Sequence, residues 1–124
     1  MAKILIADDE KYIRLLLEQA LEEITDQGVE LLLAVNGHEA LDMIRKEKPE
    51  LVFLDLMMPK LTGIEVCDAV KNKLDIRDSY IVILTAKCQA GDMQQGLKIG
   101  ADAYMSKPFD LDEIIEKTKQ VLGI

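Results

Sequence analysis

The sequence is poor in the residues that disulfide-rich proteins and histidine-based enzymes require. It has one histidine, His38, and two cysteines, Cys67 and Cys88, among 124 residues. Two cysteines in a domain of this length do not form a disulfide framework, which favours a reducing cytoplasm as the compartment. A Ser/His/Asp mechanism is difficult to build with one histidine that falls on the expected second helix. We therefore interpret His38 as an exposed helix residue and Cys67 as a packing residue.

Long hydrophobic runs and basic runs are also missing. No apolar stretch approaches the ~20 residues that a membrane-spanning helix needs, so no membrane contact is expected. No run of Lys and Arg exceeds two residues, and the formal net charge is −8. Direct binding to a nucleic acid is therefore not expected, because such binding depends on neutralising phosphates. The acidic balance fits a cation-binding site or a basic protein partner.

What the sequence does contain is a regular alternation of apolar runs and amphipathic segments, with no linker. Hydrophobic residues make up 49% of the chain, enough for the core of one domain over residues 1–124. Five short apolar runs lack polar alternation, so as strands they would be buried on both faces, as in a parallel sheet between two layers of helices. The runs are residues 4–7, 31–35, 51–54, 81–84 and, more weakly, 103–105.

Apolar residues at helical spacing follow each run. The clearest segment runs from Ile13 to Ile24, and others cover residues 40–44, 66–70, 90–97 and 111–122. Three helix starts carry a capping residue followed three positions later by Glu: Asn36 with Glu39, Thr62 with Glu65, and Asp110 with Glu113. Helix ends are expected at Gly28, Pro49 and Gly100. Five βα units in a row predict an α/β doubly wound fold.

The polar residues that follow the apolar runs are the candidates for function, because ligands bind at the carboxyl ends of the strands in an open parallel sheet. They are Asp8, Asp9 and Glu10 after the first run, Asp55 after the third, Thr85 after the fourth, and Ser106 and Lys107 after the fifth. The sequence thus predicts acids, a hydroxyl group and an ammonium group at one edge of the sheet.

Carboxylates that share an edge repel one another. Two like charges about 4 Å apart cost about 1 kcal/mol in water and about 4 kcal/mol at an effective dielectric near 20. Asp8, Asp9 and Asp55 therefore need a cation among them, or one of them takes a raised pKa. A hard divalent ion with oxygen ligands, such as Mg2+, meets this need. A helix cap is the alternative for Asp8 or Asp9 alone, but it does not explain Asp55.

Asp55 is the candidate nucleophile. An aspartate is ionised at pH 7 and can attack phosphorus without a general base. Phosphoryl transfer needs mainly positioning and charge stabilisation. Lys107 can pair with one phosphoryl oxygen, and Thr85 can donate a hydrogen bond to another. Taken singly, these two residues would be a surface lysine and a strand-end threonine.

Together these residues closely resemble the receiver domains of two-component response regulators. The matching segments, in chain order, are Asp8-Asp9-Glu10, Asp55-Leu56-Met57-Met58-Pro59 with Gly63 beyond it, Thr85-Ala86, and Lys107-Pro108. The resemblance covers essentially the whole chain and implies a flavodoxin-like fold with strand order 2-1-3-4-5. A receiver of the stand-alone, chemotaxis or sporulation-relay type is expected, with no output domain in this sequence.

The resemblance implies a role for each position. Asp55 would accept a phosphoryl group from a histidine kinase or a histidine phosphotransfer protein. Asp9 and Asp55 would bind Mg2+ directly, with the Met57 backbone carbonyl as a third ligand and Asp8 acting partly through water. Lys107 would pair with the phosphoryl group. Its peptide bond to the following proline would be cis, which costs little before proline.

The resemblance further implies a conformational switch. Thr85 would move to the new phosphate and the Tyr104 ring would turn inward behind it. A downstream protein would then read the surface formed by the fourth helix, the fifth strand and the fifth helix. For Tyr104, an amphipathic ring on an edge strand is the open alternative. Met57 and Lys87 resemble positions that tune the lifetime of the phosphoryl group.

Three other functions fit the fold but not the residues. A haloacid-dehalogenase-type phosphohydrolase would need a second acid two residues after the nucleophile, where this chain has Met57. A flavodoxin-like cofactor protein would need a Ser/Thr/Gly-rich phosphate loop after the first strand, where this chain has three acids. A pseudo-receiver, which only docks to partners, would lack one of the expected acids, the threonine or the lysine, and none is missing.

Overall fold

The sheet consists of five parallel strands in the order β2-β1-β3-β4-β5. The computed structural model describes residues 2–76, 78–85 and 99–124. The strands are β1 (Lys3–Ala7), β2 (Glu30–Ala34), β3 (Leu51–Asp55), β4 (Tyr80–Thr85) and β5 (Ala103–Ser106). The predicted fold class and strand order are confirmed.

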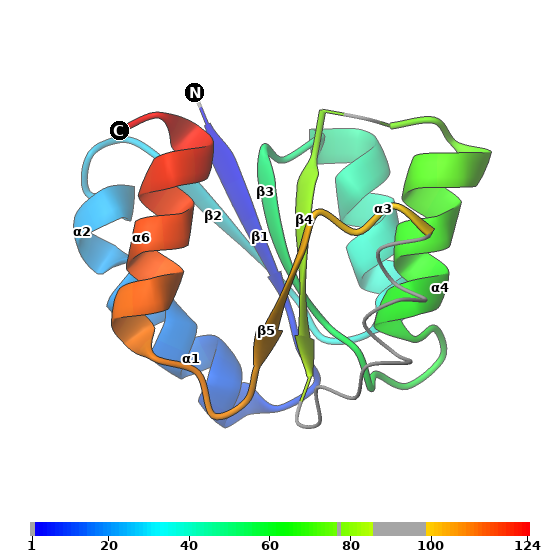
Figure 1. Ribbon diagram of the computed structural model, residues 1–124, viewed down its shortest axis with the longest axis horizontal. Coiled ribbons are helices and arrows are strands. Elements are labelled where there is room, and N and C mark those ends of the chain that lie inside the picture. The colour runs from blue at the N-terminus through cyan, green and yellow to red at the C-terminus, as the bar shows by residue number, and fades with distance from the viewer. Residues whose placement is uncertain (1, 77, 86–98) are drawn as a thin grey trace.

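Helices cover both faces of the sheet (Figure 1). One layer holds α1 (Lys11–Ala20), α2 (Glu22–Thr25) and α6 (Leu111–Leu122). The other holds α3 (Gly37–Glu47) and α4 (Gly63–Asp68), which continues into the π-helical turn η1 (Ala69–Lys73). The helix predicted over residues 90–97 lies outside the described residues, as do Lys87 and Cys88. None of the helices in the described ranges is long and apolar enough to cross a membrane.

Successive residues of the central strands point into two separate cores. Leu5, Val52 and Ile83 belong to the core under α3 and α4, and their chain neighbours Ile6, Phe53 and Leu84 belong to the core under α1 and α6. All of these side chains are fully buried, and each contributes roughly 1.5–3 kcal/mol relative to exposure. The ends of β1, β3 and β4 are thus held rigidly from both sides.

The prediction that all five strands are buried on both faces is wrong for the two edge strands. In β2, Leu33 is 36% exposed, and in β5 only Met105 is buried. The helix layers are centred on β1, β3 and β4, so they cover the edges of the sheet incompletely.

The predicted caps form, with one change of partner. The Asn36 side chain accepts a hydrogen bond from the Glu39 N–H at 2.9 Å, and Thr62 and Glu65 form a reciprocal capping box. Asp110 caps α6 by accepting from the Asp112 N–H at 2.8 Å, one residue earlier than the Glu113 that the spacing suggested. These caps fix where the helices start relative to the strand ends.

The first predicted helix is divided in two. Leu21 leaves helical geometry at φ −96° and ψ 7°, and the Ile24 N–H turns back to the Leu21 carbonyl oxygen at 3.0 Å. This tighter i→i+3 bond lets Leu17, Leu21 and Ile24 all stay buried against the sheet. Helix α3 ends before Pro49 as predicted, and its C-cap is Lys48 in the left-handed region.

Gly63 is required where α4 starts beside the end of β3. A Cβ atom at this position would lie 2.5 Å from the Asp55 carbonyl oxygen. We expect Gly63→Ala to lower the free energy of unfolding by about 1–3 kcal/mol, measured by urea denaturation, because the backbone must shift to admit the methyl group. Gly123 has φ +72° and open space around it, so Gly123→Ala should lower the free energy of unfolding only by the cost of a left-handed backbone, about 1–2 kcal/mol. A Gly63→Ala protein as stable as the original would contradict the close contact.

Candidate functional site

The strand ends bring the predicted residues to one edge of the sheet. Asp8 directly follows β1, Asp55 ends β3 and Thr85 ends β4. In the parallel register Asp55 lies beside Leu84, so Thr85 extends one residue further toward the same edge. The Lys107 N–H donates to the Thr85 carbonyl oxygen at 2.7 Å, which continues the β4–β5 pairing past the end of β5. The backbone hydrogen bonding that pairs β4 with β5 therefore also places Lys107 beside the strand ends.

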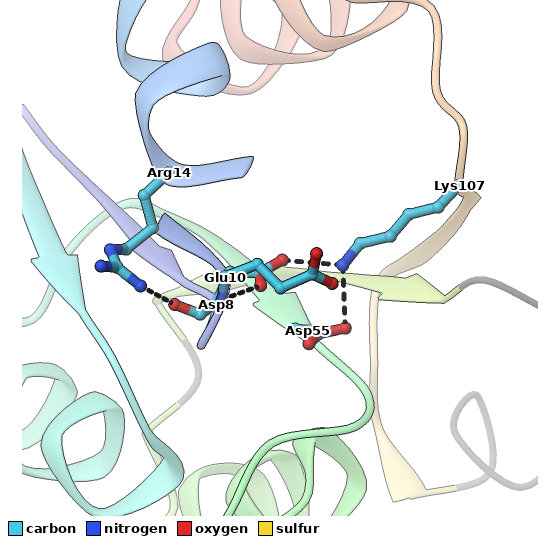
Figure 2. A network of polar contacts seen from close by, with 5 residues as sticks. All are labelled: Asp8, Glu10, Arg14, Asp55 and Lys107. Carbon is cyan, nitrogen blue, oxygen red and sulfur yellow. Dashed lines mark hydrogen bonds and ion pairs between the residues drawn. The ribbon is translucent and has the colours of Figure 1, made fainter. Parts of the chain in front are cut away.

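The Lys107 ammonium group connects two carboxylates that come from different strands. Its Nζ lies 2.7 Å from Oδ2 of Asp8 and 3.2 Å from Oδ1 of Asp55. Figure 2 shows the Lys107 side chain extending from beyond β5 to both acids. These bonds join residues that are 99 and 52 positions apart in the chain.

Asp8 is completely buried, and its polar groups are satisfied. Its N–H donates to the Ala34 carbonyl oxygen at 3.2 Å. One carboxylate oxygen, Oδ1, accepts from the Glu10 N–H at 2.9 Å, while Lys107 takes the other. No buried polar side-chain atom lacks a partner in the described part of the chain. The capping alternative for Asp8 is not what the structure shows, because α1 has Glu10 as its N-cap and no side-chain cap bond.

Burial perturbs the titration of Asp55. Desolvation, followed by the charge of Asp8, raises its pKa from 3.8 to about 6, although Lys107 acts in the opposite direction. Burial alone would lower the pKa of Lys107, but its hydrogen bond to Asp8 and the charges of both acids outweigh that effect and raise it. The Lys107 ammonium group is therefore charged at neutral pH, and the Asp55 carboxyl group ionises at a higher pH than an ordinary aspartate.

A second group of acids lies beside this ion pair. Ligand oxygens of Asp8, Asp9 and Glu10 all lie within 4.8 Å of one another, and Asp9 and Glu10 are exposed. Carboxylate oxygens are the donors that a hard divalent cation prefers, and two of these side chains are open to solvent. The donor set fits Mg2+. Glu10 belongs to it, although the resemblance assigned it no role.

The structure tests the other predicted positions unequally. The Lys107–Pro108 peptide bond is cis, as predicted. Thr85 is buried, and Tyr104 is half-buried on β5 against the core under α3 and α4. Their switch roles stay predictions. The Met57 side chain is 73% exposed, and the role of its carbonyl as a metal ligand also stays a prediction.

The two residues without an expected site role behave as predicted. His38 is exposed on α3. Cys67 is buried, and desolvation raises the pKa of its thiol to about 11, which leaves it protonated and unreactive at neutral pH.

One contact of the site had no counterpart in the sequence interpretation. Arg14 Nη1 donates to the Asp8 backbone carbonyl oxygen at 2.7 Å (Figure 2). Every residue supplies a backbone carbonyl oxygen, so the sequence does not reveal which one Arg14 binds. The only available signal was a basic residue in the first turn of a helix that directly follows three acids.

Comparison with known proteins identifies a single family. The family model described as the response regulator receiver domain matches residues 4–119. A probable transcriptional regulator ycf27 of Porphyra purpurea is 46% identical over 120 residues, which is 97% of this chain and 47% of the relative. The alkaline phosphatase synthesis transcriptional regulatory protein PhoP of Bacillus subtilis is 42% identical, over 97% of this chain and 48% of that protein. The chain thus spans about half the length of the curated relatives it matches.

Solved structures agree with the family comparison. The receiver domain of the Francisella response regulator 1452 is 33% identical to this chain and superposes with a TM-score of 0.86. The similarity covers 98% of this chain and 96% of that domain.

The raised pKa of Asp55 predicts a pH-dependent stability. The folded carboxyl group ionises near pH 6, whereas the unfolded one ionises near 3.8. Stability from this group is therefore present below pH 3.8 and lost as the pH rises through 6. In chelator-treated buffer at pH 7.5 we expect Asp55→Asn to raise the free energy of unfolding by on the order of 2 kcal/mol.

Urea denaturation at pH 7.5 and at pH 4 measures this effect. The gain should shrink toward zero at the lower pH, where Asp55 is protonated in the folded protein. Asp42→Asn, on an exposed side chain of α3, should change little at either pH. An Asp55→Asn protein that is no more stable at pH 7.5 would contradict the raised pKa.

Proposed function

The chain belongs to the response regulator receiver domain family, and on that premise we propose that Asp55 is the residue that accepts the phosphoryl group. Receiver domains are signalling modules of two-component systems, and response regulators interact with histidine kinases and downstream effectors. One observation carries the proposal. Asp55 is a strand-end carboxylate, 5% exposed, that shares the Lys107 ammonium group with a second acid.

The proposed donor is a phosphohistidine on a histidine kinase or a histidine phosphotransfer protein, met in the cytoplasm. A carboxylate with a pKa of about 6 is mostly ionised at pH 7.5, so it attacks without a general base. An Asp55 oxygen forms a bond to phosphorus while the nitrogen–phosphorus bond of the donor breaks. The imidazole nitrogen keeps the bonding electron pair and takes a proton from solvent. The product is an acyl phosphate on Asp55.

Receiver domains bind Mg2+ at an acidic pocket. In this chain we propose that Asp9 and Asp55 hold the ion directly, with the Met57 carbonyl as a further ligand and Asp8 partly through water. The grouping of the Asp8 and Asp9 carboxylate oxygens supports the part of this proposal that concerns these two residues. When bound, the ion supplies positive charge to the phosphoryl oxygens. Lys107 already contacts an oxygen of Asp55, so the same ammonium group can pair with a phosphoryl oxygen attached there.

The proposed output is a change in partner binding. An acyl phosphate adds roughly −1.5 to −2 charge at the sheet edge. Thr85 donates its hydroxyl group to the phosphate and Lys107 closes on it, which shifts the population of two states that differ at Tyr104. A downstream protein reads the surface of the fourth predicted helix, β5 and α6. Neither nucleic acid nor membrane is a proposed direct partner of this domain.

Phosphorylation of Asp55 can be tested without the natural partner. Incubation with Mg2+ and a small acyl phosphate should add one phosphoryl group, seen as a mass increase and mapped to Asp55 after borohydride trapping. Asp55→Asn removes the attacking carboxylate and should abolish the product. The Asp42→Asn protein, altered at an exposed acid on α3, should be phosphorylated normally. Labelling of the Asp55→Asn protein to the same extent would refute the assignment.

Magnesium binding predicts a stabilisation that depends on Asp9. A ligand that binds only the folded state adds about 2.7 kcal/mol at a concentration 100 times its Kd. We expect saturating Mg2+ to raise the free energy of unfolding of the unmodified protein by about this amount, measured by urea denaturation. Asp9→Asn removes one ligand and should lose most of the gain, whereas Asp42→Asn should keep it. An unmodified protein that gains nothing from Mg2+ would rule out the proposed site.

A further inference from the structure

The Arg14 side chain contacts the main chain of the acidic segment, residues 8–10. Its Nη1 donates to the Asp8 carbonyl oxygen at 2.7 Å. In the view of Figure 2, Arg14 and Lys107 reach Asp8 from opposite sides. Arg14 takes part in none of the ion pairs formed within the described ranges of the chain. Its guanidinium group therefore restrains the backbone beside the acids and leaves their carboxylates to other partners.

The N-terminus of α1 lacks the side-chain cap that three other helices have. Asn36, Thr62 and Asp110 each cap their helix with a side-chain hydrogen bond. Glu10, the N-cap of α1, makes no such bond, and the first turn of α1 carries no acid. Arg14 joins this turn to the end of β1 instead, because its N–H bonds to the Glu10 carbonyl oxygen at 3.2 Å while its side chain holds Asp8.

The segment between these two anchors carries the oxygens of the acidic group. Asp8 Oδ1 accepts from the Glu10 N–H at 2.9 Å, which closes a small turn around Asp9. The carbonyl group that Arg14 holds belongs to the peptide bond between Asp8 and Asp9. If that bond were released, this peptide plane could rotate, and the direction of the Asp9 side chain would change with it.

We propose that Arg14 is a positioning residue of the divalent-cation site: by holding the Asp8 carbonyl group, it keeps the neighbouring Asp8 and Asp9 carboxylates in place for the ion. The inference rests on the proposed function for the identity of the site. Groups that orient metal ligands from behind typically change metal affinity by about 10–100-fold when removed. The charge of Arg14 acts in the opposite sense, because a nearby cation weakens the binding of another cation. Positioning and simple electrostatics thus predict changes of opposite sign.

Arg14→Met separates these two effects, since it keeps an unbranched side chain but has neither charge nor donor. Titration calorimetry with Mg2+ alone should show an affinity about tenfold weaker than that of the unmodified protein. Lys11→Met removes the same charge from an exposed residue in the first turn of α1 and should leave the affinity unchanged or slightly increased. Arg14→Lys restores a donor and should recover most of the loss.

A metal-free measurement tests the geometry itself. In hydrogen exchange with a chelator present, peptides that cover residues 8–14 of the Arg14→Met protein should lose protection at the Glu10 amide, whose acceptor is Asp8 Oδ1. Lys11→Met should keep that protection. In phosphorylation assays, the Mg2+ concentration for half-maximal rate should rise about tenfold for Arg14→Met, while the rate at saturating Mg2+ stays within about twofold.

The outcomes distinguish this inference from the proposed function. Unchanged or tighter Mg2+ binding by Arg14→Met, with unchanged exchange at Glu10, would overturn the positioning role. An unmodified protein that binds Mg2+ but is not phosphorylated would overturn the function of Asp55 and leave the Arg14 comparison valid. If Arg14→Met does not fold, as circular dichroism would show, a shorter donor, Arg14→Gln, takes its place. Mg2+ binding by Arg14→Gln that is weaker than that of Lys11→Met would support positioning, and binding that is no weaker would overturn it.

Discussion

The repulsion among carboxylates at the end of a parallel sheet is the constraint that shapes this molecule. Asp8 is fully buried and Asp55 is 5% exposed, and such groups cannot share an edge without a cation. Lys107 supplies that cation from beyond β5, across 99 residues of chain. The ammonium group does not fully offset burial and the repulsion from Asp8, because the pKa of Asp55 remains near 6. Lys107 thus reduces the repulsion between the two acids, and the negative charge that remains at this edge can attract a second cation.

The fold meets this constraint because helices pack on both faces of the central strands and hold them rigidly. Alternate residues of β1, β3 and β4 fill separate cores, so the positions of Asp8 and Asp55 are fixed by packing that involves neither acid. Lys107 is fixed differently, through a backbone bond to the Thr85 carbonyl oxygen and through its own ion pairs. Because β5 is an edge strand with one buried residue, the cation is held from a less buried strand than β1 and β3, which position the two acids.

Residue types and spacing were sufficient to predict the α/β fold class, the three side-chain caps and the acids at the strand ends, because each depends on a local pattern. The strand order was implied only by the resemblance to receiver domains. Residue types and spacing did not predict the partner of Lys107, since the sequence does not say which of several acids at one edge an ammonium group will choose. They did not predict Arg14, because a backbone carbonyl acceptor exists at every position. The break at Leu21 and the exposure of Leu33 were missed for a different reason. Both depend on how helices cover the finished sheet, which no segment encodes alone.

If Asp55 is the acceptor, the same ammonium group has to serve in turn two carboxylates and a phosphate. Lys107 is shared between Asp8 at 2.7 Å and Asp55 at 3.2 Å, so a more strongly negative group on Asp55 would draw it toward that side and away from Asp8. Its backbone is bonded to Thr85, and β5 also carries Tyr104. A shift of one cation by a small distance would therefore act on the threonine and on the edge strand together. If so, the charge imbalance around Lys107 would both favour the reaction at Asp55 and carry its outcome to the surface.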